Sequence, residues 1–170
     1  MRKYIFIAVL LGISLCSYGQ DKNVILPEKP NRSNYVDYST KESGFWCAAQ
    51  IGAGFGDTAF LAQLDIIGGY RFSEFLRIGI GVSPRMGLKS IPLYFDARGN
   101  IISQMDRMYS FYWNAEIGYA IDDGIYLSPG LGMRFGGIRH NFLVSVNYTM
   151  QGFKDVGVKH FAGVRIGYEF

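Results

Sequence analysis

The chain has 170 residues, enough for one domain, and a formal net charge of +3 at neutral pH. It contains no run of Lys and Arg of the kind that binds phosphates, so no nucleic-acid partner is expected. Hydrophobic residues make up 49% of the chain, yet no apolar stretch beyond the first residues is long enough for a transmembrane helix.

Residues 1–19 have the features of a secretory signal peptide. Arg2 and Lys3 supply the positive start, residues 4–15 form an apolar stretch too short to span a bilayer, and Gly19 supplies a small residue for cleavage. Cleavage after Gly19 removes two basic residues and lowers the formal charge from +3 to +1. The basic character of the precursor therefore does not indicate an anionic partner.

Residues 20–43 are polar and irregular, with Pro27, Pro30 and many charged side chains. Such a composition cannot bury a core of its own. We predict that this stretch is a periplasmic N-terminal segment, and one hypothesis is that it binds other envelope proteins.

From Gly44 onwards, apolar and polar residues alternate with a period of two, which is typical of strands with unlike faces. Turn residues such as those at 122–124 interrupt the alternation. The pattern predicts eight strands, at residues 44–56, 60–72, 76–85, 91–98, 109–119, 125–136, 142–151 and 160–170.

The alternation is less regular at three places. Residues 99–107 lose it, which predicts a turn between frayed strand ends. Pro129 lies in mid-strand and cannot donate a ladder hydrogen bond, which predicts a bulge there or a strand that starts nearer Leu131. Residues 152–157 are predicted to form a polar loop.

The two faces of the strands differ in bulk and charge. One face carries Phe, Tyr, Trp, Leu and Ile and no charged residue, whereas the other is rich in glycine and holds the charges. The interior of an eight-stranded barrel is just wide enough for side chains, so the bulky face is predicted to lie outside. A soluble barrel with that face as its core would have an exterior built largely of Gly, Ser and Asn. The sequence therefore predicts an all-β fold, an eight-stranded antiparallel up-and-down transmembrane β-barrel over residues 44–170.

An even number of strands places both termini on one side of the membrane, which we predict to be the periplasm. The connections near residue 57 and at 87–90, 122–124 and 152–157 are then predicted to face outward. The predicted location is the bacterial outer membrane.

The end of the chain alternates in the same way. Val164, Ile166, Tyr168 and Phe170 lie on the apolar face of the last predicted strand. A strand that ends on an aromatic residue resembles the carboxy-terminal insertion signal of bacterial outer-membrane barrels. The resemblance implies two partners, the barrel insertion machinery and outer-membrane lipid.

Further stretches carry a resemblance to a family. They are Asn34-Tyr35-Val36-Asp37-Tyr38, Gly44-Phe45-Trp46, residues 69–72, Ile91-Pro92-Leu93-Tyr94 and Gly167-Tyr168-Glu169-Phe170. In these the chain resembles small outer-membrane β-barrel proteins common in Bacteroidota, over nearly all of residues 20–170. Members are mostly of unknown function, so the resemblance implies an architecture and no catalytic residue.

The inward face holds the candidate site. Its charged residues are Asp65, Arg71, Arg77, Arg85, Asp96, Arg98, Glu116, Arg134, Arg165 and Glu169. Buried charges persist when they are paired and hydrogen-bonded, so we interpret the set as a structural ion-pair network that plugs the lumen. The alternatives are a narrow pore for small solutes and, from the excess of arginine, an anion site.

No catalytic constellation is evident. His140 and His160 are the only histidines, and neither is spaced for metal binding. A lipid-modifying barrel enzyme would need a histidine near a serine, and no His-x-Ser arrangement surrounds His160. We expect no cofactor and no enzymatic activity, and predict a structural or envelope-interaction role.

Overall fold

The computed structural model describes residues 43–56, 60–86, 90–104, 108–121, 123–137, 140–154 and 157–170. The predicted signal peptide at 1–19 and nearly all of the predicted segment at 20–43 lie outside these residues. The described residues form strands, turns and bends, and none of them belongs to a helix that could cross a membrane.

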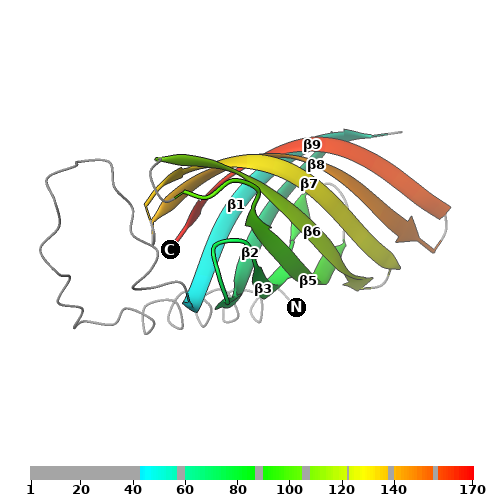
Figure 1. Ribbon diagram of the computed structural model, residues 1–170. Coiled ribbons are helices and arrows are strands. Elements are labelled where there is room, and N and C mark those ends of the chain that lie inside the picture. Colours follow the sequence, from blue (N-terminus) through cyan, green and yellow to red (C-terminus); the bar gives the residue numbers. More distant parts are fainter. Residues whose placement is uncertain are drawn as a thin grey trace, which may run out of the picture.

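All strands in this part of the chain belong to one antiparallel sheet. The order around the sheet is β1-β9-β8-β7-β6-β5-β3-β2, and pairing between β1 and β2 closes the ring (Figure 1). The strands are β1 (Gly44–Gly56), β2 (Phe60–Arg71), β3 (Arg77–Val82), β4 (Arg85–Met86), β5 (Ile91–Asn100), β6 (Tyr109–Ile121), β7 (Ile125–Gly136), β8 (Asn141–Phe153) and β9 (Gly157–Glu169).

The short β4 continues β3. Both pair with β2 in one register, because Val82 lies opposite Ile66 and Arg85 lies opposite Gln63. The break falls at Pro84, which lacks the backbone N–H of a regular strand, although its carbonyl still accepts from Leu64 N at 3.1 Å. Since β3 and β4 form one barrel strand, the described residues make a closed eight-stranded antiparallel barrel, and the predicted fold class is confirmed.

The region around Pro129 differs from the prediction. β7 begins at Ile125 and contains no bulge, because the pairs Leu127–Met150 and Gly130–Asn147 share one register with β8. Pro129 keeps its place opposite Ala115 of β6. A proline lacks only one donor, so the ladder is interrupted on the β8 side alone.

Several strand ends also extend further than the alternation predicted. β5 continues to Asn100, whose backbone N–H donates to Glu74 O at 3.0 Å, so the turn at residues 72–76 supports this end of the strand. β8 continues to Phe153, which pairs with Gly157 of β9, so residues 152, 153 and 157 of the predicted loop belong to strands.

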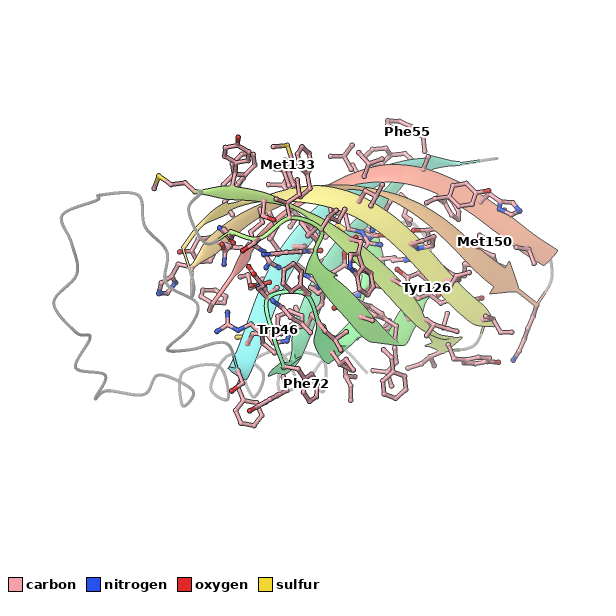
Figure 2. The ribbon with its side chains drawn as sticks, viewed as in Figure 1. Trp46, Phe55, Phe72, Tyr126, Met133 and Met150 are labelled. Carbon is pink, nitrogen blue, oxygen red and sulfur yellow. The ribbon has the colours of Figure 1, made fainter. Side chains whose placement is uncertain are left out.

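Side chains alternate between the outside of the barrel and its interior. Outward residues are exposed, as shown by Phe45 at 80% and Phe55 at 70%. In Figure 2, Phe55, Phe72 and Met133 project away from the ribbon, whereas Trp46 and Tyr126 lie within the barrel. The predicted assignment of the faces is therefore confirmed.

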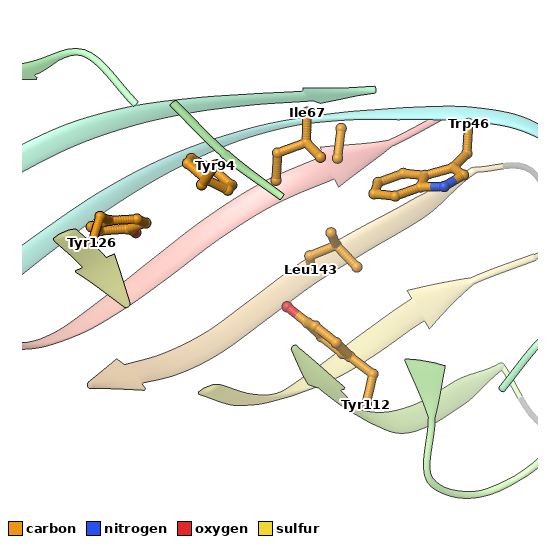
Figure 3. Close-up of a cluster of buried hydrophobic side chains, with 7 residues drawn as sticks. Trp46, Ile67, Tyr94, Tyr112, Tyr126 and Leu143 are labelled. Carbon is orange, nitrogen blue, oxygen red and sulfur yellow. The ribbon is translucent and has the colours of Figure 1, made fainter. Parts of the chain in front are cut away.

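Large aromatic side chains occupy part of the interior. Trp46, Tyr94, Tyr112 and Tyr126 come from β1, β5, β6 and β7 and project into one enclosed space (Figure 3). Inward glycines make room for them, since a Cβ on Gly81 would collide with the ring of Tyr94. The lumen is thus a packed core built from glycine, aromatic and charged residues together.

Candidate functional site

The ten charged residues predicted to line the lumen all lie inside the barrel and are buried. Arg85 is the most exposed of them, at 7%. Every Arg, Asp and Glu of the described strands belongs to this set. The structure divides the ten between two ends of the barrel. We call the end of the barrel that holds Gly44 and Glu169 the terminal end, and the end that holds Gly56 and Gly157 the loop end.

The loop cluster consists of Asp65, Arg85, Glu116 and Arg165. The Arg165 guanidinium lies between two carboxylates, with Nε 3.5 Å from Asp65 Oδ2 and Nη1 paired with Glu116. Arg165 Nη2 also donates to Ser128 Oγ at 2.8 Å and to Tyr126 OH at 3.1 Å. One arginine of β9 therefore holds side chains from three other strands, β2, β6 and β7.

Neutral groups complete the coordination of these carboxylates. Gln63 Nε2 donates to Asp65 Oδ2 at 2.7 Å, and Tyr126 OH donates to Glu116 Oε2 at 2.6 Å. Buried carboxylates are tolerated when they are paired and hydrogen-bonded in this way. The loop cluster is electrically balanced, with two arginines and two acids.

A buried glutamine links several side chains beside this cluster. Gln151, at 0% exposure, accepts a hydrogen bond from Arg85 Nη1. Its amide donates to Ser90 Oγ at 2.8 Å and to Asp123 Oδ2 at 3.2 Å. These contacts join β4, β8 and two connections across the loop end.

The terminal cluster consists of Arg77, Asp96, Arg98, Arg134 and Glu169. The Glu169 carboxylate accepts from Arg77 Nη1 and from Arg134 Nη2, the latter at 3.0 Å. Arg98 donates to both oxygens of Asp96, at 2.6 and 2.9 Å. The tenth predicted residue, Arg71, lies beside this cluster on β2, directly opposite Arg77.

The segment at 101–104 folds across the terminal end. Gln104, at 0% exposure, donates from Nε2 to Gly136 O at 2.9 Å, and its backbone N–H donates to Glu74 Oε2 at 3.1 Å. Ser103 Oγ donates to the other oxygen of Glu74 at 2.7 Å. The turn after β2, the segment after β5 and the end of β7 are thereby tied together at the terminal end.

Three arginines lie over aromatic rings inside the barrel. Arg98 lies 4.9 Å from the ring centroid of Trp46, and Arg134 lies 5.4 Å from that of Tyr112. Arg85 lies over Tyr126 at 4.9 Å. Arginine has a planar guanidinium that stacks on aromatic rings while its edges donate hydrogen bonds, so one side chain makes both kinds of contact inside the barrel.

A small cavity is found between β1, β2, β8 and β9. It is lined by Gly52, Gln63, Asn147 and Arg165, among others, and has a volume of about 10 Å³. A void of that size holds about one water molecule. It offers no room for an organic substrate.

The two histidines lie on the outer face, each beside a tyrosine. Tyr148 OH is 2.9 Å from His160 Nδ1, and His140 packs near Tyr168 with 6.1 Å between ring centroids. The partner of His160 is thus a tyrosine and not the serine that a hydrolytic pair needs. Among the described residues, no group of His, Cys, Asp and Glu is placed to hold a metal ion.

The sequence pattern placed the ten charges on the correct face but did not identify the contacts of Gln104 and Gln151. Gln151 was recognisable only as an inward polar residue of a strand, and Gln104 falls in a segment without alternation. A buried polar side chain in an irregular segment leaves no periodic signal.

Neither protein-family models nor curated proteins match this sequence. Solved structures show a likeness of fold. Neisserial surface protein A matches with a TM-score of 0.60 and 13% identity, over 75% of this chain and 97% of that one. The N-terminal β-barrel domain of Pseudomonas aeruginosa OprF matches with a TM-score of 0.49 and 13% identity, over 74% and 97%.

A de novo designed transmembrane β-barrel also matches, with a TM-score of 0.45 and 16% identity over 74% of this chain and 93% of that one. At such identities the likeness shows the fold alone. The chain has the fold of a small outer-membrane-type eight-stranded β-barrel, and its predicted membership of a Bacteroidota family stays a prediction.

Proposed function

We propose that this chain is an integral outer-membrane protein that stands in the bilayer as a closed, rigid cylinder and has no catalytic role. One observation carries the proposal. All ten charged residues of the predicted network are inside the barrel and buried, while the outer face presents large apolar side chains such as Ile51 at 65% exposure and Val146 at 62%.

This arrangement is suited to lipid and not to water. An outward band without charges is what a bilayer requires, and closure of the sheet leaves no unpaired strand edge in hydrocarbon. Aromatic pairs such as Phe55–Phe60 at the loop end and Phe45–Tyr70 at the terminal end lie where the two interfaces would be. Extraction from membranes should require detergent, and recovery of a water-soluble monomer without detergent contradicts the proposal.

The packed lumen supports a structural role over a pore. Arg165 pairs with a carboxylate of another strand across the loop half, and Gln151 and Gln104 are buried and hydrogen-bonded near the two ends. Planar-bilayer recording of the purified, folded barrel tests this directly. We expect no steady conductance at high protein concentration, and ohmic channels that scale with protein concentration would establish the pore instead.

An assay on lipopolysaccharide, the substrate on which a lipid-modifying barrel enzyme would act, tests the proposal that this chain has no catalytic role. Purified protein and a His160→Ala variant should both leave it unchanged. Turnover by the wild type that is lost with His160→Ala would overturn the non-enzymatic proposal.

The interaction role is assigned to residues 20–43. Gly44 and Glu169 lie at the same end of the barrel, so a segment preceding β1 emerges on the side where β9 ends, which we propose is the periplasm. Mild cross-linking in native envelopes should give a set of partners for the wild type that a deletion of residues 20–43 loses. The deletion variant should keep its heat-modifiable gel mobility, and an unchanged partner set contradicts this role.

A further inference from the structure

The small cavity between β1, β2, β8 and β9 lies where the last strand of the barrel meets the first. Asn147 of β8 is directly opposite Gly163 of β9, Gly163 is directly opposite Gly54 of β1, and Gly54 is directly opposite Leu61 of β2. All four residues line the cavity. Two neighbouring strands thus present glycine at the same level of the lumen, and the cavity is the space that a side chain of β9 or β1 would otherwise occupy.

The rows on either side of these glycines carry larger side chains. Gly52 lies opposite both Gln63 and Arg165, and a Cβ at Gly52 would meet the side chains of these two residues at 3.0 and 2.9 Å. On the other side, Thr149 lies opposite Phe161. The polar side chains of the lining are each at least nine-tenths buried, and they are Gln63, Asn147, Thr149 and Arg165. A molecule bound among them is therefore largely shielded from bulk solvent.

One hydrogen-bond donor of the lining has no partner in the protein. Asn147 accepts from Ser145 Oγ through its Oδ1 at 2.8 Å, whereas its Nδ2 is buried and makes no hydrogen bond. Asn147 is 3% exposed, so bulk solvent does not satisfy this group. A buried donor without an acceptor is costly, so the Nδ2 group needs an acceptor that the surrounding side chains do not supply.

We propose that the cavity binds a single structural water molecule, which accepts a hydrogen bond from Asn147 Nδ2. Gln63 and Thr149 each contribute a side-chain oxygen to which the water can donate. Water suits this lining because it both accepts and donates, and a buried water typically makes about three hydrogen bonds. The volume of about 10 Å³ is close to the least that admits one water, which excludes a second water and any larger ligand.

The position of this water gives it a structural role at the closure of the barrel. Asn147 belongs to β8 and Gln63 belongs to β2, and these strands are separated by β9 and β1. The water links side chains on the two sides of the junction between the last and the first strand. It does so at a level where Gly163 and Gly54 leave both of the intervening strands without a side chain.

A direct hydrogen bond between two asparagines is the competing arrangement. Asn114 Oδ1 is also buried without a partner, and it lies over Gly130 together with Asn147 Nδ2. If these two amides bonded to each other, the cavity would lose its free donor. A crystal structure at a resolution that shows ordered waters separates the two arrangements. We expect density for a water within hydrogen-bonding distance of Asn147 Nδ2, and either a direct bond to Asn114 or a cavity without density overturns the proposal.

Oxygen-17 relaxation dispersion of the folded barrel in detergent micelles counts the water molecules that are trapped in the protein. Unlike at Gly81, a Cβ at Gly54 would meet no atom closer than Ala162 O, at 3.4 Å, so Gly54→Ala should fold and fill the cavity. The wild type should show one trapped water more than Gly54→Ala.

Gly68→Ala is the matched control, because a Cβ there meets nothing within 4 Å, and it should give the wild-type count of trapped waters. Gel mobility checks the folding of both variants. Equal counts for the wild type and Gly54→Ala overturn the proposal, and so does an equal loss in Gly68→Ala. If Gly54→Ala does not fold, the crystal structure of the wild type decides alone.

Discussion

Arg77 of β3 and Glu169 of β9 form an ion pair across the lumen, although they are 92 positions apart in the sequence. The pair can form only when β9 has closed the barrel between β1 and β8. The strand that carries the predicted insertion signal on its outer face thus carries a structural carboxylate on its inner face. The two roles do not compete for side chains, because successive residues of a strand point to opposite sides.

Glu169→Gln should be strongly destabilising. It leaves Arg77 and Arg134 buried with no carboxylate between them, and breaking a buried ion pair typically costs about 3–5 kcal/mol. Urea unfolding in detergent micelles, followed by heat-modifiable gel mobility, measures the loss. Glu74→Gln is the matched control, because that carboxylate accepts only from neutral donors, Ser103 and Gln104, among the contacts described. Similar losses for the two variants would show that the pairing across the lumen is unimportant.

A charge on the outer face tests the orientation of the barrel. Val146 lies between Leu131 and Val164 in mid-strand, where a lysine would meet hydrocarbon. Val146→Lys should destabilise the barrel in lipid vesicles by about 2–4 kcal/mol. Ile125→Lys, at the first residue of β7, should cost only about 0–1 kcal/mol because it lies near an interface. If Val146→Lys is as harmless as Ile125→Lys, the outer face does not contact a bilayer core.

The period of two was sufficient to predict the strands, their faces and the charged set of the lumen. It was sufficient because a closed barrel uses every strand in the same way, with one face inside and one outside. Asp65 and Glu169 could thus be assigned to the interior without knowledge of their partners. The identity of the partners could not be predicted, because the alternation fixes the face of a residue but not which side chain lies across the lumen.

Local departures from the pattern were harder to predict. Pro129 was expected to cause a bulge, but β7 keeps its register because its pairing with β6 is intact. Ser128 Oγ of β7 also bonds to Thr149 Oγ1 of β8 at 2.9 Å, which links these two strands beside the proline. The burial and hydrogen bonds of Gln104 occur in a segment without periodicity, and only the three-dimensional arrangement of the connections reveals them.

The inward glycines should tolerate substitution far less well than the outward ones. An alanine at position 81 would push against the ring of Tyr94, which is 1% exposed and packs 5.4 Å from the ring of Tyr126. Gly81→Ala should therefore cost about 1–3 kcal/mol, the usual cost of overpacking. Gly68→Ala is the matched control, because a Cβ there meets nothing within 4 Å, and it should be neutral or stabilising by about 0.4–1 kcal/mol. Urea unfolding curves of both variants decide the point, and equal effects would show that the lumen is not tightly packed.

The predicted insertion signal at Val164, Ile166, Tyr168 and Phe170 can be separated from the stability of the barrel. Phe170 packs edge-on against Tyr168 with ring centroids 5.1 Å apart and is 49% exposed, so about half of its surface is not covered by the protein. Its backbone N–H donates to Cys47 O at 2.8 Å, a bond that any non-proline residue can make. Phe170→Ser should therefore refold in detergent with a urea midpoint close to that of the wild type, yet accumulate in the outer membrane of cells at a clearly lower level. A parallel loss in both measurements would assign Phe170 to the stability of the barrel, and normal accumulation in cells would remove it from the signal.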